Sequence, residues 1–109
     1  MSVQRYQSGC WRVIEASGDL DIQVVPRLRA LVVGNPLHVV FDLCRVTFLD
    51  AGILGILVAT RANQGLAHGA VRIAAPSPRV HRLIAITQLE AVLPAFETLD
   101  QAVAGHEAC

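Results

Sequence analysis

The chain has 109 residues and a mass of 11.7 kDa, which suits one ordinary domain and is too little for two. Nine Lys plus Arg balance nine Asp plus Glu, and every one of these basic residues is Arg. This balance excludes the charge pattern of a nucleic-acid-binding domain and the basic excess of a protein that binds anionic membranes. The absence of Lys also excludes a Schiff-base lysine and a P-loop.

Hydrophobic residues make up 53% of the chain, yet no direct membrane insertion is expected. The uncharged run Ala51–Thr60 is roughly half as long as a membrane-spanning helix. Met1–Cys10 contains no apolar segment of the kind found in a signal peptide. The sequence therefore predicts a cytoplasmic protein.

The first part of the chain predicts one strand and one helix. Residues 1–8 are polar, and we expect them to form a flexible tail. Cys10–Ser17 alternates apolar and polar residues, as a half-buried strand does, and Gly18–Asp21 is typical of a turn. A helix is expected over Val25–Val33, with Pro26 in its first turn, where a missing N–H is tolerated.

The middle of the chain predicts a buried strand and a long helix. Leu37–Leu43 is mostly apolar, which is typical of a central strand that is buried on both faces of a sheet. Cys44–Asp50 is expected to be the loop that leaves this strand. Ala51–Gln64 is expected to be a helix closed by Gly65, and Ala70–Ala75 another strand.

The last part predicts two helices that flank a short extended piece. Ser77 is a suitable N-cap, with Pro78 at the first helical position. The extended piece is expected around Val92 and Leu93, and a final amphipathic helix over about residues 97–104.

Strands and helices alternate along the chain, which indicates a layered α/β fold with parallel strand pairing. We expect one domain over residues 9–104 and a short C-terminal tail over residues 105–109.

Three carboxylates form the one concentration of polar residues. Asp19 and Asp21 follow the first expected strand, and Asp50 follows the second. If the two strands are parallel neighbours, their carboxyl ends share the sheet edge where ligands bind, so a Mg²⁺ site is one interpretation. The other is structural, because Asp21 and Asp50 precede helices and would cap them. Without a GxSxG, HExxH or CxxC motif, we expect no catalytic residue, cofactor or metal.

The helix expected over Ala51–Gln64 has two apolar faces. One face carries large aliphatic side chains that suit a core. The opposite face would normally be charged, but it is small and apolar until Asn63. Its residues are Gly52, Gly55, Ile56, Ala59 and Asn63. Either the monomer covers both faces, or the second face meets a partner. We favour the partner, because a domain of 109 residues rarely has enough chain to cover a helix twice.

Three segments resemble the STAS domain family, which includes the anti-sigma-factor antagonists. Gly18–Asp21 is similar to the family's turn after its first strand. Val39–Gly55 (VVFDLCRVTFLDAGILG) is similar to its strand, its Asp and its regulatory helix. Pro76–Leu83 (PSPRVHRL) is similar to its Ser-Pro segment, and Leu89 and Phe96 follow at familiar positions.

The resemblance covers about residues 10–104 and implies a STAS-like single domain with a four- or five-stranded mixed sheet and about four helices. It implies no catalysis and no cofactor. The implied partner is an anti-sigma factor of the serine kinase type, which otherwise sequesters a sigma factor. The residues that the resemblance and the helix pattern assign to partner binding are Asp19, Asp21, Asp50, Ala51, Gly52, Gly55, Ile56 and Ala59.

The sequence departs from the family at the residue that follows Asp50. In the antagonists this residue is a serine that the kinase phosphorylates, whereas here it is Ala51, followed by Gly52. Neither has a hydroxyl, so we expect binding that is independent of phosphorylation. The nearest hydroxyl, on Thr47, is expected to belong to a turn. An accessory role in a lipid ABC transporter or another signalling assembly is the alternative, and a homodimer stays open.

Overall fold

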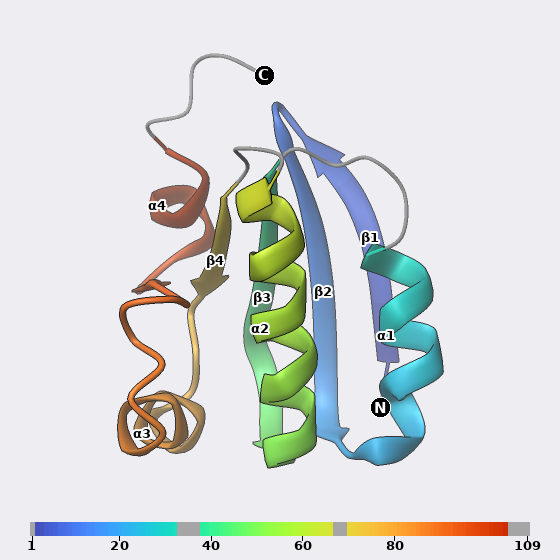
Figure 1. Cartoon of the computed structure of the whole chain (residues 1–109), viewed down its shortest axis with the longest axis vertical. Helices are drawn as coiled ribbons and strands as arrows, with labels where there is room; N and C mark the ends of the chain where they lie inside the picture. Colours follow the sequence, from blue (N-terminus) through green and yellow to red (C-terminus); the bar gives the residue numbers. More distant parts are fainter. Residues whose placement is uncertain (1, 33–37, 67–69, 105–109) are drawn as a thin grey trace.

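The structure is a computed structural model that describes residues 2–32, 38–66 and 70–104. A five-stranded sheet forms its centre, with the strands in sequence order (Figure 1). β1 is antiparallel to β2, and the other neighbouring strands are parallel. This confirms the mixed α/β sheet. The strands are β1 (Ser2–Ser8), β2 (Trp11–Leu20), β3 (His38–Leu49), β4 (Val71–Ala74) and β5 (Ala95–Phe96).

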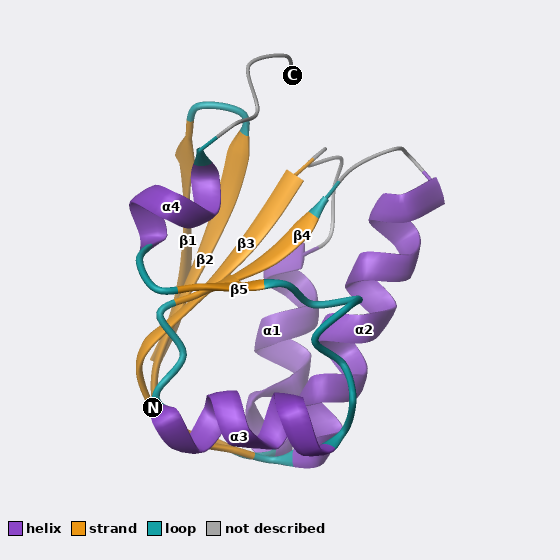
Figure 2. Ribbon diagram, turned by 90° about the vertical axis from the view of Figure 1, so that its left-hand side faces the viewer, coloured by secondary structure: helices purple, strands orange, loops and turns teal. Residues whose placement is uncertain are grey.

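Helices cover both faces of the sheet. α1 and α2 lie on one face, α4 lies on the other, and α3 lies across one end (Figure 2). Four α-helices therefore occur in the described ranges, in agreement with the expected number, together with one short 3₁₀ helix. They are η1 (Ile22–Val24), α1 (Val25–Val32), α2 (Ala51–Leu66), α3 (Pro78–Ile86) and α4 (Leu99–Val103).

The sheet separates two apolar cores. Val39 and Phe41 of β3 belong to the larger core, which includes residues of α1, α2 and α3. Val40 points to the smaller core, where it joins Trp11 and Ala102 of α4. Successive strand residues point to opposite faces, so this alternation confirms that β3 is buried on both sides.

Residues 2–8 do not form the expected flexible tail. They form β1, which pairs with β2 from Ser2 opposite Ser17 to Ser8 opposite Trp11. Only Val3 of this strand is buried. An edge strand with one solvated face has few apolar residues, which is why its sequence looks like that of a tail. The expected tail over residues 105–109 lies outside the described residues.

Two segments expected as a turn and a loop are strands. β2 continues through Gly18, Asp19 and Leu20 of the expected turn, and β3 continues through Cys44–Leu49 of the expected loop. The pairing shifts register between Gly18 and Asp19, and Gly18 has a φ of 81°, which glycine adopts readily. This irregularity lets the two strands stay paired as far as Leu20 opposite Leu49.

The later boundaries are partly as predicted. The Ser77 side chain accepts a hydrogen bond from the backbone N–H of Val80, and Pro78 begins α3, which confirms the cap. α2 continues to Leu66, so Gly65 does not close it. The extended piece expected at Val92 and Leu93 lies instead at Ala95–Phe96, which pairs with β4.

Candidate functional site

The first acidic residues of the candidate site are held by local hydrogen bonds. The Oδ1 atom of Asp19 accepts a bond of 2.6 Å from the hydroxyl of Thr47. Thr47 lies on β3 and not in the expected turn, and its neighbour Phe48 pairs with Asp19 across the two strands. Asp21 is the N-cap of η1 and accepts from the backbone N–H of Gln23 at 2.9 Å.

Asp50 caps the start of α2. Its Oδ1 atom accepts a bond of 2.8 Å from the backbone N–H of Gly52, and its carbonyl accepts from the N–H of Ile53 at 2.9 Å. Its own N–H donates to the carbonyl of Leu20, which links the end of β2 to the start of α2. These bonds confirm the capping interpretation for Asp21 and Asp50. In the described part of the chain, no group of three or more His, Cys, Asp or Glu side chains is placed to hold a metal ion.

The second face of α2 is mostly open to solvent. Gly52, Gly55 and Ala59 are exposed, as is Ala51 at the first position of the helix. Ile56, which the sequence placed on the same face, is only 8% exposed and belongs to the larger core. The expectation of an open position is therefore wrong for Ile56, since α1 packs beside it.

A groove runs between α1 and α2. It has a volume of about 490 Å³, and we call it the α1–α2 groove. A side chain built at Gly55 would meet nothing within 4 Å, so packing within the monomer does not require glycine there. The groove is lined by Arg29, Val32, Gly52, Gly55, Ile56, Ala59 and Thr60.

The substitution Gly55→Ala is expected to raise the free energy of unfolding by about 1 kcal/mol, because glycine in a helix interior costs that much relative to alanine. Urea unfolding followed by circular dichroism measures the change. Gly52→Ala is the matched control and should gain less, since its Cβ would lie 3.3 Å from Oδ1 of Asp50. A loss of stability in Gly55→Ala would show that glycine is needed for the fold itself.

Two exposed apolar side chains near the start of α2 are not predicted by the sequence pattern. Phe48 is 44% exposed at the end of β3, and Ile86 is 71% exposed at the end of α3. Both line the same hollow, which also includes Ala51. Ile86 could have been found from the sequence, because it is a large apolar residue on the same side of α3 as Arg79 and Arg82. Phe48 could not, because the segment that contains it was expected to be a loop.

Comparison with known protein families identifies the fold. The family model of the STAS domain matches residues 2–102. The chain belongs to the STAS domain family. No curated protein sequence matches this STAS domain significantly. Within the described residues, no helix is both long and apolar enough to cross a bilayer.

Solved structures resemble this STAS domain over most of its length. An anti-sigma factor antagonist from Mycobacterium paratuberculosis is 31% identical, with a TM-score of 0.82, and the match covers 94% of this chain and 90% of that one. SpoIIAA of Bacillus, an anti-sigma factor antagonist, is 20% identical in its unphosphorylated form, with a TM-score of 0.81 and coverages of 94% and 93%. A sulfate transporter family protein from Wolinella succinogenes is 17% identical, with a TM-score of 0.76 and coverages of 89% and 84%. The last two likenesses concern the fold alone.

Proposed function

We propose that this STAS domain is a non-catalytic antagonist that binds a serine-kinase anti-sigma factor whether or not ATP is present. The observation that carries the proposal is the exposed methyl group of Ala51 at the first position of α2, directly after the capping residue Asp50. The family resemblance assigns a phosphorylated serine to this position. Alanine has no hydroxyl, so the kinase would find no acceptor there.

The surroundings of Ala51 support a binding role. Ala51 opens onto the hollow that contains Phe48, whereas Gly52 opens onto the α1–α2 groove. Exposed apolar surface next to an open groove is typical of a protein interaction site. The similarity to the anti-sigma factor antagonist from Mycobacterium paratuberculosis favours an anti-sigma factor as the occupant.

In this proposal the protein works in the cytoplasm, where its partner would be found. The competing role is that of an accessory subunit of a lipid ABC transporter or another signalling assembly. Co-purification with membrane components would favour that role, and co-purification with a soluble kinase would count against it.

The substitution Ala59→Arg tests where the partner binds. Ala59 is exposed and lines the α1–α2 groove, so a long charged side chain there would block close approach of another backbone. Against the serine-kinase anti-sigma factors encoded by the same genome, the dissociation constant measured by calorimetry should rise at least about tenfold. Ala91→Arg, at an exposed alanine that lines neither hollow, should leave it unchanged. Failure of every such kinase to bind the wild type would refute the proposed function.

A further inference from the structure

A second hollow lies between α3 and the end of β3, on the other side of the α2 N-terminus from the α1–α2 groove. It has a volume of about 300 Å³ and an almost entirely apolar wall. We call it the α3 hollow. The residues that matter for its chemistry are Phe48, Ala51, Arg79, Arg82, Leu83 and Ile86.

One face of α3 supplies both the apolar and the charged part of this wall. Arg79, Arg82, Leu83 and Ile86 are spaced at i, i+3, i+4 and i+7, which places them on one side of a helix. Arg79 and Arg82 are exposed, and neither guanidinium forms an ion pair or hydrogen bond with any residue described by the structure. Two positive charges therefore flank an apolar hollow without being neutralised by the described part of the protein.

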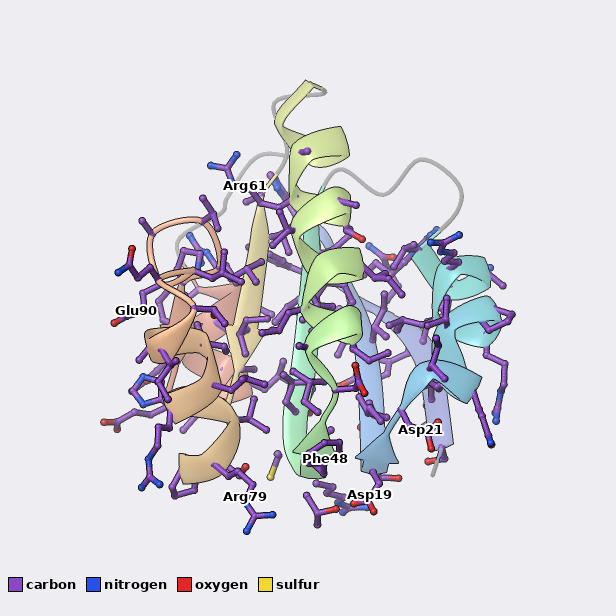
Figure 3. All side chains as sticks on the ribbon, turned by 60° about the horizontal axis from the view of Figure 1, so that its bottom comes forward. Asp19, Asp21, Phe48, Arg61, Arg79 and Glu90 are labelled. Atoms are coloured by element: carbon purple, nitrogen blue, oxygen red, sulfur yellow. The ribbon has the colours of Figure 1, made fainter. Side chains whose placement is uncertain are left out.

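The opposite side of the α2 N-terminus carries the opposite charge. Phe48 lies between Arg79 on one side and Asp19 on the other, with Asp21 beyond (Figure 3). A third carboxylate, that of Asp50, caps the start of α2 by accepting from the N–H of Gly52. A segment with positive charges would be attracted to the aspartates, whereas a segment with negative charges would be attracted to α3 and repelled by the aspartates. The surface therefore selects the orientation of whatever binds it.

We propose that the α3 hollow receives an apolar side chain of the partner that is flanked by carboxylates, which pair with Arg79 and Arg82. The proposal rests on the proposed function, because it gives the chemistry of the partner at the edge of the same surface. An apolar anchor fills the space between Phe48 and Ile86, where water has few polar groups to bind. The carboxylates fix the register of the anchor, because Arg presents a planar fork that matches a carboxylate.

Two synthetic peptides of about 14 residues, roughly four helical turns, test the charge preference directly. Both carry Leu and Phe along one face. One has Glu at the flanking positions, and its twin has Lys at every one of these positions. In ¹⁵N spectra of the full chain, the Glu peptide should shift the amide signals of Phe48 and Ile86. It should bind at least about tenfold more tightly than the Lys peptide.

Charge reversal supplies the matched variants. The double variant Arg79→Glu with Arg82→Glu should bind the Glu peptide more weakly than the wild type does and the Lys peptide more tightly. The control, Arg27→Glu with Arg61→Glu, changes the same total charge at two other exposed arginines and should keep the wild-type preference. Equal affinity of the wild type for both peptides would overturn the inference, as would shifts confined to the α1–α2 groove. Binding of the wild type, but not of the first variant, to vesicles of equal parts phosphatidylglycerol and phosphatidylcholine would also overturn it, in favour of a lipid surface.

The failure of this inference can be told apart from the failure of the proposed function. If a kinase binds the wild type and the reversal at Arg79 and Arg82 leaves its affinity unchanged, the inference is wrong and the proposed function stands. If the Glu peptide occupies the α3 hollow but no kinase binds the wild type, the proposed function is wrong and the charge preference of the hollow stands.

Discussion

Replacing Arg72 with alanine is expected to lower the free energy of unfolding by about 3 kcal/mol. This is less than the sum of its two cation–π contacts and two charge-assisted hydrogen bonds, because contacts made by one side chain are not additive. The Arg72 guanidinium lies 5.0 Å from the ring centroids of both Trp11 and Phe96. It also donates to the carbonyl oxygens of Ala102 at 2.8 Å and Ala104 at 3.0 Å. These contacts tie α4 to β2, β4 and β5, and burial lowers the pKa of the guanidinium without removing its charge at neutral pH.

Thermal and urea unfolding measure this effect, with an expected fall in Tm of roughly 10–20 °C for a domain of this size. Arg72→Lys keeps the charge but loses the planar fork, so its stability should lie between those of the wild type and the alanine variant. The control Arg61→Ala removes an exposed arginine from α2 and should change stability by less than about 0.5 kcal/mol. A loss below about 1 kcal/mol in Arg72→Ala would mean that Arg72 does not hold α4 in place.

The sequence predicts the helix faces well where a single helix decides them. The spacing of Gly52, Gly55 and Ala59 along α2 is enough to place them on one side, and all three are exposed. Ile56 is at the border of that side, and its burial depends on α1, which packs against α2. A periodic pattern predicts which residues share one face of a helix, but it does not predict where the neighbouring helix lies.

The sequence also predicts caps well and strand extensions poorly. Asp21 and Ser77 each precede a helix, and each accepts a hydrogen bond from a backbone N–H of the first turn. The continuation of β2 through Gly18 depends on pairing with residues of β3 that follow it by about 30 positions in the chain. Local propensity cannot report such a long-range pairing, which is why Phe48 was placed in a loop and the α3 hollow was missed.

Under the proposed function, the substitution Ala51→Ser is expected to create a site that the kinase phosphorylates. Ala51 is exposed at the first position of α2, so a serine would fit there with little effect on stability. A kinase that binds the surface should phosphorylate it when ATP is added. The phosphate would place added bulk and about two negative charges next to Asp50. Affinity for the kinase should then fall at least about a hundredfold, because an unpaired phosphate charge next to Asp50 at the interface costs several kcal/mol.

Phosphate transfer is measured by intact mass, and affinity is measured by calorimetry with ATP and with a non-hydrolysable analogue. The control Ala51→Gly carries no hydroxyl, so it should gain no phosphate and should keep the wild-type affinity with ATP and with the analogue. A serine variant that is phosphorylated yet keeps its affinity would show that the start of α2 lies outside the interface.

The most direct test measures how tightly the wild type binds the kinase in the presence and in the absence of ATP. Its dissociation constant for the serine-kinase anti-sigma factor is measured by calorimetry after incubation with and without ATP, and its mass is recorded each time. We expect the same affinity in both conditions and no added phosphate, because Ala51 offers no acceptor. A tenfold or greater loss of affinity with ATP, together with a phosphate on Thr47 or Thr60, would contradict phosphorylation-independent binding.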